Sequence, residues 1–214
     1  MKLKQFAPVL SFALAFSVQA TQPAAWPGFR GENASGVSDT AKLPEKFGPN
    51  DNVAWIVDLP WSPSSPCVWG DKIFLTAFAN KKLETRAYDL AGGKLLWTQA
   101  APSENIEEFH ATEGSPAAST PATDGRYVVS YFGSAGLFCY DFKGTELWRV
   151  SLPTVNSPGS FGTGGSPIIA GGLVFVPRDQ ATGSTLLAVD LKTGKKAWEA
   201  PRSDVMPGFG TPII

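Results

Sequence analysis

Residues 188–198 read AVDLKTGKKAW: an apolar segment ending in Asp190, a glycine-containing turn, and a second segment ending in Trp198. The same pattern occurs earlier as AYDLAGGKLLW (87–97) and CYDFKGTELW (139–148), which spaces the three tryptophans 51 and 50 residues apart. Two short β-prone runs joined by a glycine turn predict an antiparallel hairpin. The aspartate before each turn is expected to accept hydrogen bonds from backbone amides of that turn.

A second element precedes each hairpin and consists of Ser-Pro or Thr-Pro, a short strand, a tight turn and a β-rich strand. The copies are SPCVWGDKIFL (65–75), TPATDGRYVV (120–129) and SPIIAGGLVFV (166–176), and a fourth begins as TPII (211–214). Proline is tolerated at the start of a strand because its missing N–H lies outside the ladder. Four strand signals in each repeat of about fifty residues predict an all-β fold, a β-propeller of four-stranded antiparallel blades. A β-sandwich with accidental self-similarity is the alternative.

The overall composition agrees with many short strands and excludes a nucleic-acid-binding face. The chain has 214 residues, 43% of them hydrophobic and 17% charged, which is enough for a packed core. Glycine and proline, the main turn residues, number 22 and 18. The formal net charge is -1 and no run of lysine and arginine stands out, so no basic surface for nucleic acid is expected.

The first twenty residues predict a secretory signal peptide. Lys2 and Lys4 precede an apolar stretch over residues 6–18, and Val18-Gln19-Ala20 supplies small residues at the cleavage positions. The stretch is too short for a membrane-spanning helix, although an uncleaved anchor is the alternative. Thr21 rather than cysteine follows the cut, so a lipoprotein is not expected. These features predict a periplasmic or extracellular protein with no transmembrane segment after cleavage, an N-terminal extended segment over 21–52, and a partial propeller over 53–214.

The two cysteines and the single histidine do not predict a zinc site, because structural zinc usually takes four Cys or His ligands. Cys67 and Cys139 belong to different repeats, on strands expected at different depths in their blades. A disulfide requires Cα atoms within about 7 Å of each other. We therefore expect two buried free thiols.

Four tryptophans are expected to fill the contacts between neighbouring blades. A blade cannot bury both faces of its sheet alone, and a large aromatic side chain on the outer strand covers ~150–250 Å². This interpretation applies to Trp97, Trp148 and Trp198, which end the three hairpins. Residues 53–58 resemble an outermost strand that closes the last blade of a ring, with Trp55 as its aromatic residue.

The repeat resembles that of the pyrroloquinoline-quinone-like (PQQ-like) β-propeller family, most closely in the Asp-x-x-Thr-Gly-Lys-x-x-Trp copy that ends at Trp198. The opening WPGFRG (26–31), followed by GVS (36–38), is similar to the start of secreted family members, which are often described as similar to the outer-membrane assembly factor BamB. The resemblance implies seven or eight blades, so the three repeats and the partial fourth would be a fragment of such a ring. The missing blades would come from the rest of a longer chain or from a second subunit.

The resemblance implies one of two functions. One branch of the family consists of dehydrogenases that hold PQQ and calcium on the propeller axis, beside a disulfide between adjacent cysteines. The other branch binds no quinone and serves as a scaffold. This chain has no adjacent cysteine pair. The expectation is therefore a non-catalytic module with no cofactor and no catalytic residue, which binds an unknown protein or small-ligand partner through its loops. A PQQ- and calcium-dependent dehydrogenase is the alternative.

Candidate ligand-binding residues lie in the connectors between repeats, where length varies most. The longest connector carries Glu107, Glu108, His110 and Glu113, a set that predicts a divalent-cation site. An acidic solvated loop with His110 bonded to a neighbour is the alternative, and we favour it because the spacing is irregular. The next connector, residues 157–166, is rich in glycine and serine, and its amides are suited to an anion.

Overall fold

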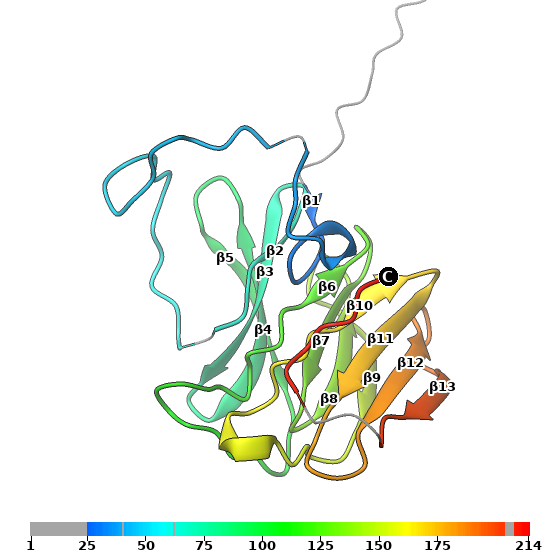
Figure 1. Cartoon of the computed structure of the whole chain (residues 1–214). Coiled ribbons are helices and arrows are strands. Elements are labelled where there is room, and N and C mark those ends of the chain that lie inside the picture. The colour runs from blue at the N-terminus through cyan, green and yellow to red at the C-terminus, as the bar shows by residue number, and fades with distance from the viewer. Residues whose placement is uncertain (1–24, 40, 62, 204–207) are drawn as a thin grey trace, which may run out of the picture.

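The computed structural model describes residues 25–39, 41–61, 63–203 and 208–214, so the predicted signal peptide lies outside the described residues. The described residues form three antiparallel sheets (Figure 1). The first sheet contains, in spatial order, β1 (Ala25–Trp26), β2 (Cys67–Trp69), β3 (Lys72–Ala79), β4 (Lys82–Asp89) and β5 (Leu95–Ala101). The second contains β6 (Ala122–Thr123), β7 (Val128–Phe132), β8 (Gly136–Tyr140) and β9 (Glu146–Ser151). The third contains β10 (Ile168–Ala170), β11 (Leu173–Arg178), β12 (Thr185–Asp190) and β13 (Lys196–Pro201).

Helical structure among the described residues is limited to two 3₁₀ turns, η1 (Glu32–Ala34) and η2 (Pro158–Ser160). No described helix has the length and apolar character needed to cross a membrane. The all-β prediction is therefore confirmed.

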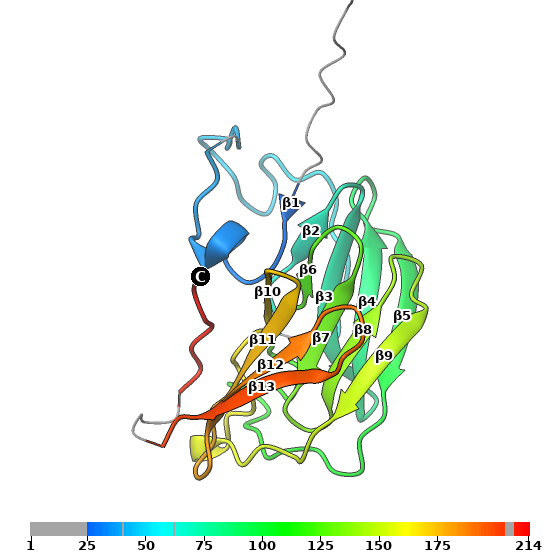
Figure 2. The same ribbon diagram turned by 90° about the vertical axis from the view of Figure 1, so that its right-hand side faces the viewer.

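The three sheets are adjoining blades that fan out from a common inner edge (Figures 1 and 2). The short strands β2, β6 and β10 lie at that edge, where β6 contacts both of the others. Each blade then proceeds outward through three longer strands to β5, β9 or β13. This arrangement is that of a β-propeller, as the repeat predicts.

All three hairpins have the same register. Trp97, Trp148 and Trp198 lie opposite Ala87, Cys139 and Ala188, and a bulge follows each of these partners. The aspartates accept the predicted turn hydrogen bonds: Asp89 Oδ1 from the Gly92 amide at 2.8 Å, Asp141 Oδ1 from the Thr145 amide at 2.8 Å, and Asp190 Oδ1 from the Thr193 amide at 2.9 Å. The turn prediction is confirmed.

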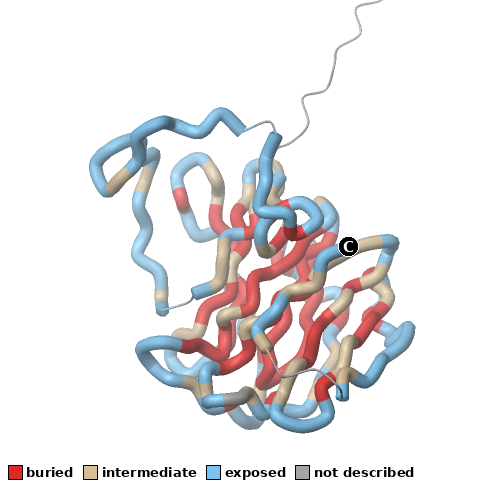
Figure 3. The backbone as a smooth tube through the Cα atoms, in the orientation of Figure 1, coloured by how far each residue is buried: buried red, intermediate tan, exposed pale blue. Residues whose placement is uncertain are grey.

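The core lies between the blades rather than inside any one of them. Buried residues concentrate in the strands, whereas the turns and the N-terminal segment are exposed (Figure 3). Between the second and third blades, the buried Tyr131 and Leu137 belong to one apolar cluster with Val176 and Leu187. Every residue of β7 and β8 is buried, because a blade covers each face of the middle sheet.

Two features of the N-terminal region differ from the prediction. Residues 53–58 are not a strand: Trp55 attaches this extended segment to the first blade through its side chain, and a β-ladder would require backbone pairing with a neighbouring strand. In the predicted extended segment, Ala25 and Trp26 instead form β1, which pairs with Trp69 and Val68 of the innermost strand β2. Ala25 and Trp26 therefore lie at the inner edge of the first blade, beyond β2.

Candidate functional site

The connectors from β5 to β6 (residues 102–121) and from β9 to β10 (residues 152–167) meet at one end of the blades, and we call this surface the connector face. An isolated antiparallel bridge joins Phe109 of the first connector to Phe161 of the second. The segment before β2 also reaches this surface, because the Trp61 indole donates a hydrogen bond to the Gly114 carbonyl at 3.2 Å. Three segments far apart in the sequence thus form one continuous surface.

Glu107 is the buried acidic residue of this face, with only 3% of its surface exposed. Its amide donates to Ser134 Oγ at 3.0 Å, and its Oε2 accepts from Thr163 Oγ1 at 2.7 Å. Its other carboxylate oxygen, Oε1, is buried and has no hydrogen-bond partner. Gly133 makes room for this contact, since a Cβ at that position would overlap Thr163 Oγ1. Burial raises the pKa of Glu107 to about 7, although the Thr163 hydrogen bond opposes the shift.

The other predicted metal ligands lie apart from Glu107 and from one another. Glu108 is exposed, and its Oε2 accepts from Ser160 Oγ at 2.8 Å. The exposed His110 ring packs against Phe161, with 5.1 Å between ring centroids, and Glu113 is exposed. Within the described ranges, no group of three or more His, Cys, Asp or Glu side chains is arranged to hold a metal ion. The four residues are not brought together because one points into the core while the others lie along the surface.

Three residues of the second connector belong to this site and were not singled out from the sequence. The hydroxyls of Ser160 and Thr163 bond to Glu108 and Glu107, and Phe161 packs against His110. The one signal in the sequence was the glycine- and serine-rich composition of residues 157–166, which we interpreted as a set of backbone amides for an anion. The side-chain hydroxyls bond instead to glutamates across the face.

Two hollows open on the connector face. The first has a volume of about 400 Å³ and is lined by Ile106, Glu107, Glu108, Phe109 and Ser160. The second, of about 290 Å³, lies beside Phe161 and Phe209, two rings that are 40% and 49% exposed. The two connectors contain no lysine or arginine. The face therefore combines carboxylates with apolar surface, and the buried Arg178 reaches it from β11 through a hydrogen bond to the Pro153 carbonyl at 2.8 Å.

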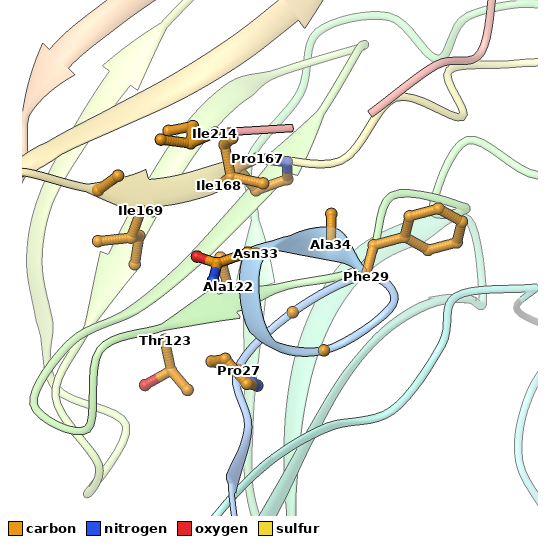
Figure 4. Close-up of a pocket in the computed structure, with 13 residues that line it drawn as sticks. Pro27, Phe29, Asn33, Ala34, Ala122, Thr123, Pro167, Ile168, Ile169 and Ile214 are labelled. Carbon is orange, nitrogen blue, oxygen red and sulfur yellow. The ribbon is translucent and has the colours of Figure 1, made fainter. Parts of the chain in front are cut away.

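A smaller pocket of about 60 Å³ lies at the axis, between the N-terminal segment and the inner strands (Figure 4). Pro27 and Asn33 face Ala122, Thr123 and Ile168 there. The segment is fixed to the second blade because the Pro27 carbonyl accepts the Thr123 amide at 2.8 Å. The N-terminal segment thus covers the inner strands of the second and third blades.

The axial pocket does not fit PQQ or calcium. Its lining contains no lysine, arginine, aspartate or glutamate, whereas calcium takes six to eight oxygen ligands, usually including carboxylates. An anionic quinone needs cationic side chains or several converging donors, and this lining is mostly apolar. The lining of this pocket is therefore unsuited to either group.

The tryptophans connect neighbouring blades at the outer rim in one repeated way. The indole Nε1 of Trp97 donates to the Phe142 carbonyl at 3.2 Å, and that of Trp148 donates to the Leu191 carbonyl at 2.9 Å. Trp55 makes the same bond to the Leu90 carbonyl at 3.0 Å. Each ring lies against a turn glycine of the following blade, namely Gly93 beneath Trp55, Gly144 beneath Trp97 and Gly194 beneath Trp148.

The fourth tryptophan has a different environment. Trp198 lies on β13, is 41% exposed, and packs against Phe175 of its own blade at a centroid distance of 5.8 Å. By contrast, Trp148 is 9% exposed. The difference follows from position, because β13 is the outer strand of the third blade and no described turn lies over it.

A second repeated contact connects the blades near the axis, at the Ser-Pro and Thr-Pro positions. The amide of Ser65 donates to Thr120 Oγ1 at 3.0 Å, the amide of Thr120 to Ser166 Oγ at 3.0 Å, and the amide of Ser166 to Thr211 Oγ1 at 3.2 Å. Each of these residues precedes a proline, which has no amide N–H to donate. The amide and the hydroxyl of the residue before the proline make the bonds between neighbouring blades instead. We call these three bonds the axial chain.

Comparison with protein families identifies one match. The family model described as "Outer membrane protein assembly factor BamB" matches residues 81–213, more than half of the chain. A search of curated proteins found no match.

Comparison with solved structures gives matches of low sequence identity. A quinohemoprotein alcohol dehydrogenase from Pseudomonas putida HK5 is 20% identical with a TM-score of 0.57, over 84% of this chain and 27% of that chain. A europium-containing methanol dehydrogenase is 17% identical with a TM-score of 0.50, over 67% of this chain and 25% of that chain. BamB from Moraxella catarrhalis is 16% identical with a TM-score of 0.41, over 61% of this chain and 33% of that chain. The chain thus spans about a quarter to a third of the length of these proteins.

Proposed function

Because this chain belongs to the PQQ-like β-propeller family described as outer membrane protein assembly factor BamB, we propose that it is a non-catalytic binding module. Its connector face engages a protein or small-ligand partner. One observation carries the proposal: this face has two open hollows, one beside the exposed Glu108 carboxylate and one beside the partly exposed rings of Phe161 and Phe209. Exposed apolar surface bordered by polar groups is typical of interaction sites.

The rim and the axial chain support this choice of surface. Both consist of contacts that recur from blade to blade, and such contacts serve the stability of the ring. The connectors differ in sequence and in their contacts at each junction. Binding residues lie disproportionately on loops that a rigid scaffold positions.

The chemistry of the cysteines and of the axial pocket argues against the dehydrogenase alternative. Cys67 and Cys139 are free and buried in different blades, and burial raises the pKa of both thiols. A buried, protonated thiol is unreactive. The axial pocket offers neither the charged side chains nor the carboxylates that PQQ and calcium require.

We further propose that the protein is exported and acts in the periplasm or outside the cell. The sequence of residues 1–20 supports export, and the matching family is described as an assembly factor for outer membrane proteins. Fusion of residues 1–24 to an alkaline phosphatase reporter tests this point. Activity that depends on Lys2, Lys4 and the apolar stretch supports export, and an inactive fusion contradicts it.

The binding role is tested by site-specific photo-crosslinking in cells that produce the full chain. A benzoylphenylalanine replaces Phe161 on the connector face or Leu147 on the outer strand β9, two side chains of similar exposure at 40% and 46%. We expect a discrete adduct from position 161 and none from position 147. Equal adducts at both positions, or none at 161, would contradict the proposal.

A parallel assay addresses catalysis directly. The purified chain is incubated with PQQ and calcium, and reduction of an electron-accepting dye is followed with alcohols and sugars as substrates. We expect no turnover above that of the cofactor alone. Turnover that saturates with substrate would replace the binding role with the dehydrogenase alternative.

A further inference from the structure

We propose that residues 25–36 form a strap across the inner strands of the three blades, and that this strap opens as one unit while the blades stay folded. We call these residues the axial strap. The strap and the connector face lie at opposite ends of the blades, as the blue turn (residues 32–34) and the yellow turn (residues 158–160) show in Figures 1 and 2. The inference is therefore independent of the proposed function. Three properties of the strap support it: its attachment, its internal bonding and the surface that it covers.

The strap is attached to two blades through main-chain groups. Its first two residues, Ala25 and Trp26, form β1 and pair with the innermost strand β2 of the first blade. The next residue, Pro27, accepts a hydrogen bond from the Thr123 amide of the second blade at 2.8 Å. In both places the strap bonds to the free edge of an inner strand, as an added peptide strand does. The strap therefore links the first and second blades at their inner edges.

The strap is bonded internally and so behaves as one body. The Gly31 amide donates to the Gly28 carbonyl at 3.0 Å, and the Gly36 amide donates to the Arg30 carbonyl at 2.7 Å. The Trp26 ring lies against Gly31, where a Cβ would come within 2.6 Å of the ring. This contact repeats the arrangement at the outer rim, a tryptophan over a turn glycine, within a single segment. These contacts hold the turn together without any group from the blades.

The strap covers an apolar surface without filling the space above it. Ala122 of the second blade and Ile168 and Ile169 of the third face the strap across the axial pocket of about 60 Å³ (Figure 4). Among the described residues, no main-chain hydrogen bond joins the strap to the third blade. Apolar groups that do not meet lose their dispersion contacts. The strap is therefore held weakly on the side of the third blade.

The strap is held by far less buried structure than a blade strand. β1 has two residues and neither is buried, whereas β7 and β8 have five residues each and all are buried. Within the strap, only Gly28, Gly31 and Ala34 are buried. A segment with few buried contacts opens at a free energy well below that of global unfolding. Opening of the strap therefore exposes the Thr123 amide and the apolar pocket while the blades stay folded.

Native-state hydrogen exchange of the full chain tests whether the strap opens alone. The Thr123 amide reports on the strap because its acceptor is the Pro27 carbonyl, and the amides of β8 report on the blade. At low urea, Thr123 should exchange at least ten-fold faster than the slowest β8 amides. Its rate should be almost independent of urea, because local opening exposes little surface. The slowest β8 amides should accelerate with urea, because they exchange when the blade unfolds.

A pair of glycine variants tests the role of the Trp26 contact. Gly31 and Gly183 both have φ 73°, so alanine strains the backbone alike at the two positions. At Gly31 the new Cβ meets the Trp26 ring, whereas at Gly183 its nearest neighbour is an ordinary contact at 3.8 Å. Gly31→Ala should accelerate exchange of the Thr123 amide at least ten-fold. Gly183→Ala is the matched control and should leave this exchange unchanged.

Thiol labelling tests what the opening exposes. Ala122 lines the axial pocket and is 2% exposed, so Ala122→Cys places a thiol beneath the strap. The native thiols of Cys67 and Cys139 are buried between blades and serve as internal controls. A maleimide should label position 122 slowly, and at least ten-fold faster when Gly31→Ala is added. Cys67 and Cys139 should stay unlabelled in both proteins, as peptide mass analysis would show.

Four results would overturn the inference. Thr123 exchange that follows the β8 amides at every urea concentration would make the strap part of the blade. Exchange of Thr123 at the rate of an unprotected amide would mean that the strap is not closed in solution. Equal acceleration in Gly31→Ala and Gly183→Ala would assign the effect to backbone strain, and equal labelling of position 122 with and without Gly31→Ala would show that the strap does not cover the pocket. The photo-crosslinking test of the connector face stands separately from all four.

Discussion

The outer rim and the connector face both join neighbouring blades, and they do so by opposite means. At the rim, an indole donates to a turn carbonyl and covers a turn glycine. This contact occurs at both junctions between the described blades and once more where Trp55 attaches the N-terminal segment to the first blade, with bond lengths of 2.9–3.2 Å. On the connector face, Glu107, Glu108 and Phe109 each make a contact that occurs once. A contact that recurs at every junction serves assembly, and a contact that occurs once is free to serve recognition.

Replacement of Trp148 should cause the largest loss of stability. It should also show that the tryptophans of the three hairpins do not contribute equally. Trp148→Ala removes a ring that is 9% exposed together with its bond to Leu191, and we expect unfolding to become about 3–5 kcal/mol easier. Trp198→Ala, at the same repeat position but 41% exposed, should cost about 1 kcal/mol. Urea unfolding of the full chain measures both, and similar losses would mean that burial does not distinguish the two sites.

Glu107 should give the connector face a pH dependence that the rim does not have. Its pKa rises from an ordinary 4.5 to about 7 on folding, so the folded chain holds a proton that the unfolded chain has released between these values. The contribution of Glu107 to stability is therefore fully present below pH 4.5, decreases between pH 4.5 and 7, and is lost above pH 7. Two and a half pKa units correspond to a loss of about 3 kcal/mol.

The free energy of unfolding of wild type and Glu107→Gln, measured across pH 4.5–8.5, gives the contribution of Glu107. We expect the difference between them to grow in favour of Glu107→Gln as pH rises from 4.5 to 7, and to stay constant above 7. Glu104→Gln, which removes an exposed carboxylate, should follow the wild-type profile. Parallel profiles for wild type and Glu107→Gln would contradict the prediction, because they would mean that the Glu107 carboxyl has the same pKa in the folded and the unfolded chain.

Alanine substitution of two glycines distinguishes the stability cost of disturbing the indole contact at the rim from the cost of straining a turn. Gly194 has φ 69° and a Cβ there would lie 2.7 Å from the Trp148 ring, whereas Gly171 has φ 55° and open space around it. Both alanine variants should lose about 1 kcal/mol of stability, because alanine is strained in the left-handed backbone conformation that both glycines adopt. Gly194→Ala should lose about 2 kcal/mol more, because the indole must move. Thermal unfolding checks the difference, and equal losses would place the whole cost in the turn.

The axial chain should show the smallest effect of the repeated contacts. Thr120→Val preserves shape but removes the acceptor of the Ser65 amide, and we expect a loss of about 1 kcal/mol. Hydrogen exchange of the Ser65 amide should accelerate, while that of the Thr120 amide, which bonds to Ser166, should not. Unchanged exchange at Ser65 would show that another group satisfies this amide.

Much of the fold was predictable because its determining contacts recur along the chain. Each Asp190-type turn is local, and the tryptophan that ends each hairpin returns at a fixed interval. The pairing of Ala25 and Trp26 with β2 was not predictable, because two residues show no alternation and the partner lies more than forty residues away. The same holds for residues 53–58, whose composition suits a strand but which attach through one side chain.

The candidate site was predictable only in part. The sequence singled out the acidic connector, but Glu107 and Glu108 are adjacent and chemically alike, and the fold alone buries one and exposes the other. The partner of Glu107, Thr163, lies 56 residues further along the chain, in a connector of irregular spacing. No periodic pattern relates these two positions, so the sequence could show an acidic connector but not that one of its carboxylates is buried and the next one exposed.

The axial chain has a consequence for how such a protein evolves. Thr120 and Ser166, each before an inner-strand proline, both contribute a hydroxyl as acceptor and an amide as donor. A duplicated unit of about fifty residues would therefore carry both halves of the junction and join its neighbours without any compensating substitution. Gene duplication can thus lengthen the array one unit at a time, while selection acts separately on the unrepeated connectors.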